Sequence, residues 1–126
     1  MVVYLCPRCW GEVDLKAERC PHCGTLLAEY AALSYEDKLL NALTHRIKDY
    51  RIMAIRLLAR MKSEKAITAF ERLLDTEEDV YVVREAVRAL VSMHGPTKQE
   101  TLRRLLGHRS ELVRTVACEL ARPDAA

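Results

Sequence analysis

Four of the five cysteines lie in two CxxC pairs near the N-terminus, Cys6 with Cys9 and Cys20 with Cys23. Two residues between the cysteines of a pair let one tight turn present both sulfurs to the same ion. A proline follows the first cysteine of each pair and presets that turn. Four thiolates fill a tetrahedral zinc shell and leave no open position for water or substrate. The spacing therefore predicts one structural Zn²⁺ ion rather than a catalytic metal.

Two other states of these cysteines are compatible with the spacing. Two disulfides or free thiols would require an oxidising compartment, of which the sequence gives no sign. Iron in a rubredoxin-like centre is the second alternative, because four thiolates can hold either metal. His22, inside the second pair, could in principle also bind the ion, but with four thiolates available we expect it to be solvated.

Apolar residues around the cysteines suit the short strands of a hairpin: Val2, Val3, Tyr4 and Leu5, then Val13 and Leu15, with Leu26 and Leu27 as a third edge. A segment this short cannot build a hydrophobic core of its own, and metal binding must therefore supply its folding free energy. The pattern CPxC…CPxCG resembles the small zinc ribbons common at the ends of prokaryotic proteins, and the four cysteines carry the match. Trp10 stands where that pattern usually has Gly. We expect Trp10 to cover the zinc knuckle or to dock on the neighbouring domain, with a partner contact as the alternative.

The sequence predicts a ribbon at residues 1–27, a connector at 28–33 and a helical region at 34–122. The connector has no run of Gly, Pro or Ser, so it is not a flexible linker by composition. We expect Tyr30 and Leu33 to contact the ribbon or the first helices.

An internal repeat dominates the remaining chain. Ala54, Ala86 and Ala117 recur at spacings of 32 and then 31 residues. A period of this length predicts stacked helix pairs, because one pair cannot bury its apolar face alone. Apolar stripes and turn residues indicate about six helices in antiparallel pairs, with Ser34, Asp49 and Thr97 as predicted caps and residues 75–79 as an acidic capping turn. Phe70 is a predicted core residue.

The repeats resemble HEAT-like repeats, especially the short bacterial kind in which a Val-Arg pair precedes an Ala-rich helix. Val83-Arg84, Val113-Arg114 and the recurring alanine carry the resemblance, whereas Tyr50-Arg51 replaces Val-Arg in the first repeat. The resemblance implies a mainly α protein, an α-solenoid with a small N-terminal β zinc ribbon.

In this register the array begins with a lone helix and stops after the first helix of a third pair. The last helix then carries Leu112, Val113, Val116 and Leu120 without a following partner, and Cys118 on its buried side. Either a partner or a second copy covers that end, which makes a homodimer through this helix possible, or the surplus apolar surface is small.

No catalytic arrangement is recognisable in the sequence. The four histidines (His22, His45, His94 and His108) are scattered, and capping explains those near helix ends better than catalysis does. We expect no enzyme activity. A third hypothesis is an enzyme related to bilin lyases, which carry similar repeats, but only the repeats support it.

Composition limits the partner and the compartment. A net charge of +2, from 20 basic and 18 acidic residues, is too weak to indicate nucleic acid by itself. No apolar run approaches the roughly 18 residues of a membrane span, and the N-terminus lacks a secretory pattern. We expect a cytoplasmic, prokaryotic protein without a membrane partner.

Basic residues gather in two groups: Arg103, Arg104, His108, Arg109 and Arg114, and then Arg56, Arg60, Lys62 and Lys65. They could bind phosphates or an acidic protein surface, or form a solvated helix face balanced by nearby acids.

The first functional hypothesis is an adaptor for another protein. Its inner surface would be lined by the second helix of each pair, with Glu64, Thr68, Glu71, Arg72, Gln99 and Arg103 as candidates. The partner-binding residues predicted from the sequence are Trp10, Glu71, Arg72, Arg103, Arg104 and Arg109. The alternative is a nucleic-acid-associated protein that uses the ribbon and the arginine-rich face to bind phosphates.

Overall fold

The computed structural model describes residues 4–93 and 97–122. Its N-terminal part is a two-stranded antiparallel hairpin, β1 (Tyr4–Leu5) and β2 (Glu12–Val13), in which Tyr4 faces Val13. A single bridge joins Arg19 to Leu26 and partly confirms the expected third edge. Leu27, the other residue expected in that edge, instead begins a helix. Val2 and Val3 of the expected first strand lie outside the described residues.

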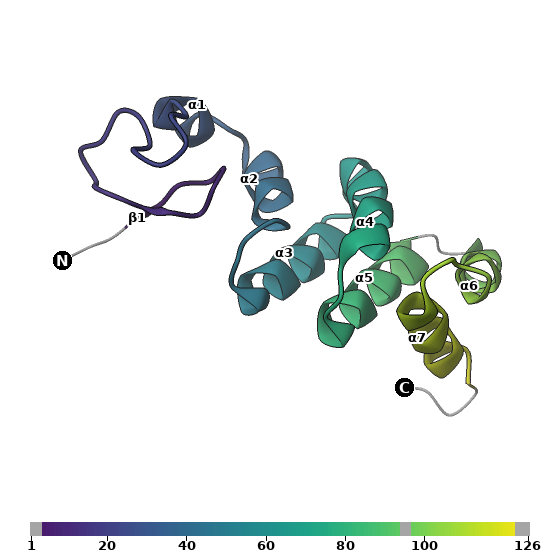
Figure 1. Cartoon of the computed structure of the whole chain (residues 1–126). Helices are drawn as coiled ribbons and strands as arrows, with labels where there is room; N and C mark the ends of the chain where they lie inside the picture. Colours follow the sequence, from purple (N-terminus) through teal and green to yellow (C-terminus); the bar gives the residue numbers. More distant parts are fainter. Residues whose placement is uncertain (1–3, 94–96, 123–126) are drawn as a thin grey trace.

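Seven helices follow in the described part of the chain. They are α1 (Leu27–Ala31), α2 (Tyr35–Ala42), α3 (Lys48–Arg60), α4 (Glu64–Thr76), α5 (Val80–Met93), α6 (Lys98–Leu106) and α7 (Glu111–Ala121). The short α1 occupies the expected connector, and α2 to α7 are the six helices predicted for the array. The mainly α fold with a small β ribbon is thus confirmed (Figure 1). Within the described residues, no helix combines the length and the apolar composition needed to cross a bilayer.

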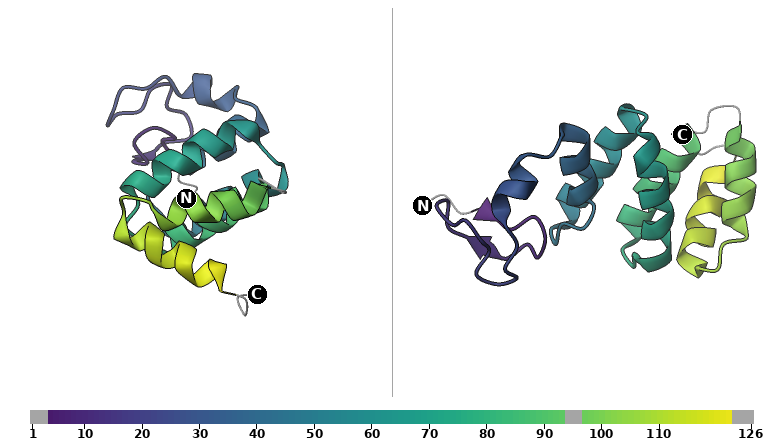
Figure 2. Two further views of the ribbon diagram at one scale, coloured as in Figure 1. Left: turned by 90° about the vertical axis from the view of Figure 1, so that its right-hand side faces the viewer. Right: turned by 90° about the horizontal axis from the view of Figure 1, so that it is seen from above.

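The helices pair as α2 with α3, α4 with α5, and α6 with α7, and the three pairs lie side by side along the array (Figure 2, right). This differs from the predicted register, which started a pair at α3 and left α2 alone. The helix α4 packs mainly on α5 and only slightly on α3. Consequently α3, α5 and α7 are the second helices of their pairs, and each of the six described helices of the array has a partner.

Serine side chains begin three of the helices. Ser34, Ser63 and Ser110 each accept a hydrogen bond from the backbone N–H three residues later, which satisfies a donor that the helix itself leaves free. Asp79 does the same for α5 by accepting from the N–H groups of Tyr81 and Val82, so the acidic turn has its predicted capping role.

One predicted cap is wrong, and another occupies the expected position without the expected side-chain bond. The N-cap of α3 is Ile47, without a side-chain capping bond, and Asp49 lies inside the first turn. Thr97 is the N-cap residue of α6, but its side chain does not make the capping bond that was expected with Glu100 nearby. In the first turn of a helix, Asp49 and Glu100 can still act favourably on the helix dipole.

The recurring alanine lies at the contacts between second helices. Ala54, Ala86 and Ala117 are all buried, on α3, α5 and α7, and these three helices pack on one another in succession. A small side chain at this position lets neighbouring helices approach closely. Phe70 on α4 is fully buried, as predicted, and is the largest of the fully buried side chains.

The C-terminal helix α7 buries its apolar face inside the chain. Val113 and Val116 are covered by packing against α5 and α6, and Leu112 and Leu120 are half-buried against the same core. Among the described residues the surplus apolar surface of α7 is therefore small, which is the second of the two outcomes expected for this end; the homodimer stays a prediction. Cys118 is exposed, so the prediction that it is a core residue is wrong: it lies one position beyond the buried stripe.

Candidate metal centre and array surfaces

The first CxxC pair forms a tight knuckle. The N–H of Cys6 donates to the carbonyl of Gly11 at 2.8 Å, and the N–H of Trp10 donates to the carbonyl of Cys6 at 2.7 Å. The N–H of Arg8 points at the Cys6 sulfur, 3.4 Å away. Such N–H groups stabilise negative charge on sulfur, as a thiolate ligand requires.

The second pair repeats this geometry. The N–H of Cys20 donates to the carbonyl of Thr25 at 2.9 Å, and the N–H of Gly24 donates to the carbonyl of Cys20 at 2.9 Å. The N–H of His22 lies 3.3 Å from the Cys20 sulfur. The two knuckles are thus equivalent hydrogen-bonded turns that present their sulfurs to a common point.

The four sulfurs lie within 4.8 Å of one another. The Sγ atoms of Cys6 and Cys23 are 3.6 Å apart, and so are those of Cys9 and Cys20. All four cysteines are free, and the separations are far beyond the roughly 2 Å of a disulfide. A tetrahedron of thiolates around zinc, with bonds of about 2.3 Å, has sulfur–sulfur edges of about 3.8 Å. The cluster can therefore hold a metal ion.

The sulfurs influence one another's ionisation. A backbone hydrogen bond from Gly11 lowers the pKa of the Cys9 thiol, but partial desolvation and the other three sulfurs outweigh it and raise this pKa to about 11. Hydrogen bonding with the side chain and the backbone of Thr25 lowers the pKa of Cys23 to about 6. Four thiolates at this distance require a cation between them, which is the chemistry that these residues fit.

His22 lies outside the sulfur cluster. Its Nε2 atom is 3.0 Å from the carbonyl oxygen of Glu12, and its ring packs so closely on Gly11 that a Cβ there would lie 2.6 Å from Cδ2. His22 is exposed, as expected, but it makes this bond across the hairpin as well.

Trp10 docks the ribbon on the helical array, one of the two roles expected for it. Its ring lies 4.3 Å from the His45 ring, and its Nε1–H donates to Thr44 Oγ1 at 3.2 Å. His45 in turn lies 4.7 Å from the Tyr50 ring. A further bond runs from the Asn41 side-chain amide to the carbonyl of Pro7, at 2.7 Å. The first knuckle is thus fixed to α2 and to the start of α3.

The ribbon, α1 and α2 enclose an apolar groove of about 580 Å³, to which Tyr30 and Leu33 contribute together with Trp10. The two connector residues therefore lie where they were expected, between the ribbon and the first helices. The connector is held by this packing.

His45 begins a motif that appears again two repeats later. Its Nδ1 accepts a hydrogen bond from the N–H of Ile47 at 3.0 Å, and Arg51 donates to its carbonyl at 2.7 Å. Burial, followed by the charges of Arg46 and Arg51, lowers the pKa of His45. The ring is therefore neutral at pH 7, with its proton on Nε2.

At the start of α7, His108 Nδ1 accepts from the N–H of Ser110 at 3.0 Å, and Arg114 donates to the His108 carbonyl at 2.7 Å. Both histidines thus order the loop that precedes a second helix, rather than capping a last turn as expected. The sequence signal is visible in retrospect, because residues 45–51 and 108–114 share the pattern HRxxxxR. His94 lies outside the described residues.

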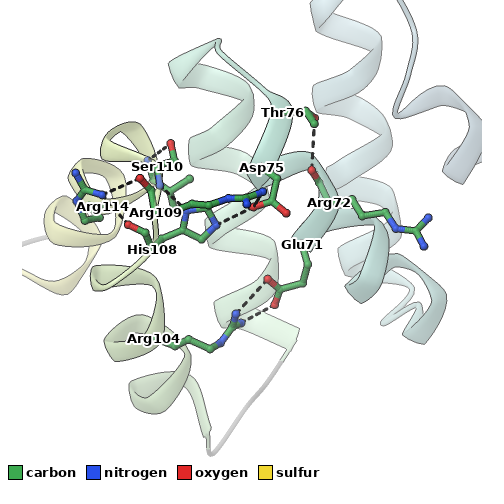
Figure 3. A network of polar contacts seen from close by, with 10 residues as sticks. Glu71, Arg72, Asp75, Thr76, Arg104, His108, Arg109, Ser110 and Arg114 are labelled. Carbon is green, nitrogen blue, oxygen red and sulfur yellow. Dashed lines mark hydrogen bonds and ion pairs between the residues drawn. The ribbon is translucent and has the colours of Figure 1, made fainter.

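The C-terminal basic cluster is largely engaged within the chain (Figure 3). Arg104 grips the Glu71 carboxylate with both guanidinium nitrogens, at 3.1 and 2.5 Å. His108 Nε2 and an Arg109 nitrogen lie 3.3 and 3.1 Å from the same oxygen of Asp75. These contacts join α6 and the loop after it to α4, in the preceding repeat.

Arg72 and Arg103 differ from this cluster. Both are exposed, and in the described part of the chain neither side chain has a hydrogen-bonding or ionic partner. Figure 3 shows the Arg72 side chain pointing away from Glu71 and Asp75. Of the partner-binding residues predicted on the array, only these two are free to bind something else.

Comparison with known protein families supports the architecture. Residues 36–122 match the family of HEAT repeats. The chain belongs to the HEAT-repeat family. No curated protein and no solved structure matches it.

The HEAT array has two helical layers, and the polar candidates lie on the first. Glu64, Thr68, Glu71, Arg72, Gln99 and Arg103 were expected on the second helices, but they lie on α4 and α6. Their expected place on the second helices is wrong because the pairing register is shifted by one helix, and their role as partner contacts stays a prediction.

The second layer of the array consists of α3, α5 and α7. Two ion pairs tie it together, Arg56 to Glu85 at 2.7 Å and Arg84 to Glu119 at 3.3 Å. These residues line a groove of about 560 Å³, beside Tyr81. Tyr81 is 57% exposed.

Proposed function

We propose that this protein is a non-enzymatic adaptor whose HEAT array presents its second helical layer to another protein. The observation that carries the proposal is this layer itself, in which α3, α5 and α7 pack in sequence beneath exposed side chains such as Met53 and Tyr81. HEAT repeats often serve as protein-binding scaffolds, because stacking makes an extended surface.

We further propose that Cys6, Cys9, Cys20 and Cys23 bind one structural Zn²⁺ ion. The free thiols and the tetrahedral spacing of the sulfurs support this assignment. A filled shell of four thiolates leaves no site for substrate. The assignment includes a reducing, cytoplasmic setting in a prokaryote, since free cysteine pairs persist where thiols are kept reduced.

We propose the same division of the chain as the sequence suggests: a ribbon at 1–27, a connector at 28–33 and the array at 34–122. The support is that β1 and β2 lie in the first segment, most of α1 in the second, and α2 to α7 in the third. Because Trp10 and Asn41 join the ribbon to the array, the ribbon caps the first end of the solenoid. Terminal repeats need such a cap to keep their outer face soluble.

The adaptor proposal can be tested with a photo-crosslinking amino acid placed at single positions in cells. Met53 and Tyr81 sample the second layer, and Arg72 and Arg103 sample the first. We expect discrete, nuclease-resistant crosslinks to protein from Met53 and Tyr81. Crosslinks from Arg72 and Arg103 alone would move the binding surface to the first layer, as the sequence-derived residues suggest. Absence of protein crosslinks from all four positions would contradict the adaptor function.

The alternative function is nucleic-acid binding by the arginine-rich face. The free side chains of Arg72 and Arg103 favour it, but Arg104 and Arg109 already pair with carboxylates. Fluorescence anisotropy with labelled single- and double-stranded oligonucleotides would decide. Binding that falls steeply with salt and with Arg103→Ala would support this alternative.

A further inference from the structure

Two arginines on neighbouring second helices carry unneutralised charge. Arg60 on α3 and Arg88 on α5 are exposed, and among the described residues neither has an ion pair or hydrogen bond from its side chain. Both line one shallow groove of about 340 Å³. Its floor is apolar, with the half-buried Ala59 beside the buried Ile55 and Ala89, and the Arg56–Glu85 ion pair also lines it.

The neighbouring cations are neutralised, which makes these two distinct. Arg56, one turn before Arg60, pairs with Glu85, and Arg84, one turn before Arg88, pairs with Glu119. Like charges one turn apart on a helix repel each other. The carboxylates relieve that repulsion and leave one free guanidinium on each helix.

Exposed apolar side chains accompany the free arginines. Met53, on the same helix as Arg60, is 48% exposed, and it lines a groove together with Arg60 and Ile52. Tyr81 stands near the start of α5, with Lys48 and Arg84 over its ring at 5.1 and 5.7 Å. Along each helix, an apolar residue and a free cation are therefore separated by about two turns.

We propose that the surface formed by Met53 and Arg60 on α3 and by Tyr81 and Arg88 on α5 binds an acidic amphipathic segment of another protein. This surface is called here the α3/α5 groove. The carboxylates of the segment are taken by Arg60 and Arg88, because the guanidinium fork matches a carboxylate in two-point geometry. Its apolar residues lie over Met53 and Tyr81, as in other helix-in-groove complexes. The inference rests on the proposed adaptor function and names the class of partner.

The acidic residues of the second layer favour a peptide over nucleic acid. Asp49, Glu85 and Glu119 line the same layer. A nucleic acid would bring a continuous row of phosphates against these carboxylates. An acidic protein segment can place neutral or basic residues there and keep its carboxylates for Arg60 and Arg88.

The test uses the full metal-loaded chain and a labelled synthetic peptide that carries Glu and Leu on opposite faces of a helix. Binding is measured by fluorescence anisotropy. We expect Arg60→Ala and Arg88→Ala each to weaken binding about tenfold, the effect of losing a charge-assisted hydrogen bond. Arg72→Ala and Arg103→Ala are matched controls, because they remove arginines of the other layer that are also exposed and have no partner among the described residues. We expect these controls to change binding less than twofold.

Several results would overturn the inference. Equal weakening by all four substitutions would mean non-specific attraction by a basic protein. Failure of the peptide to bind would exclude the recognition of acidic segments. Tighter binding of a single-stranded oligonucleotide, lost in Arg60→Ala and Arg88→Ala, would assign the groove to nucleic acid instead.

The crosslinking experiment separates this inference from the adaptor function. If Met53 and Tyr81 still crosslink to protein in the Arg60→Ala, Arg88→Ala double variant, the adaptor stands and the acidic-segment inference fails. If they crosslink only with both arginines present, both are supported. Circular dichroism of each variant checks folding, which we expect to be unchanged because both side chains are exposed.

Discussion

At the residue scale, the two knuckles differ at the position after the second cysteine. Gly24 has a φ of 77° there, and Trp10 has a φ of 60°. A left-handed backbone is easy for glycine and costs about 1–2 kcal/mol for other residues. The ring contact with His45 and the hydrogen bond to Thr44 offset that cost. The first knuckle therefore has Trp10 where the second has Gly24, because only the first knuckle docks on the helical array through this residue.

Replacing Trp10 with Gly should separate docking from metal binding. We expect Trp10→Gly to retain the bound metal, because the backbone geometry of the knuckle becomes easier, and to loosen the ribbon from the array. Amide hydrogen exchange at residues 41–45 should become faster, and metal content by mass spectrometry should not change. Thr44→Val, which keeps the Trp10 ring and removes the Thr44 hydroxyl with its bonds to Trp10 and to the Asn41 carbonyl, should have a smaller effect. Unchanged exchange in Trp10→Gly would show that docking does not depend on this ring.

Cysteine substitutions test the metal centre. Cys6→Ser should lose most of the bound metal, because one of four thiolate ligands is removed from a buried position. The control is Cys118→Ser, which changes an exposed cysteine on α7 and should leave metal content intact. A full complement of metal in Cys6→Ser would exclude the four-cysteine site.

His45 should make stability depend on pH. Burial lowers its pKa in the folded state below the ordinary value of about 6.5, so the unfolded chain binds the proton more readily. The stabilisation from His45 is then fully present above about pH 6.5 and decreases as pH falls below that value. Melting temperatures measured between pH 8 and pH 5 should decline less in His45→Asn, whose side-chain oxygen can still accept from Ile47. Parallel curves for both proteins would refute the prediction.

At the scale of the elements, the helices share one apolar core that holds both large and small side chains. Phe70 on α4 is fully buried in the core that also contains Ala54 and Ala86. Phe70→Ala should lower the free energy of unfolding by roughly 3–5 kcal/mol, because it removes apolar contacts and leaves a cavity. Urea denaturation measures this change, with the exposed Thr68→Ala on the same helix as the control. A loss below about 1 kcal/mol would contradict the assigned packing of α4.

At the scale of the whole molecule, the ribbon and the array have different sources of stability. In the described part of the ribbon the buried apolar core consists of Cys6, Val13 and Cys20, with Leu27 packed against them, whereas a large apolar cluster runs through the array. A strong chelator should therefore unfold the ribbon and leave the helices intact. Trp10 is the only tryptophan, so its fluorescence should shift to the red while the helical circular dichroism is kept. Concerted loss of both signals would show that the array depends on the metal.

Features that depend on local spacing could be predicted from the sequence. The CxxC pairs predict two tight turns, and the recurring alanine and the apolar stripes predict the repeat and the six helices of the array. These signals are local because each knuckle or helix is specified within a few turns of chain. Phe70 could be predicted as a core residue for the same reason.

The pairing of the helices, by contrast, could not be predicted, because it depends on contacts between whole elements. A repeat period fixes the length of the unit but not where the unit begins, so α4 could be assigned to α3 or to α5 equally well. Because α4 pairs with α5, Arg72 and Arg103 lie on the first layer, and α3, α5 and α7 form the second. Which arginines are free to bind a partner also depends on the tertiary structure, because Arg104 pairs with Glu71, which lies 33 residues earlier in the chain. Arg60 and Arg88 are helical arginines like Arg104, but no carboxylate among the described residues pairs with them.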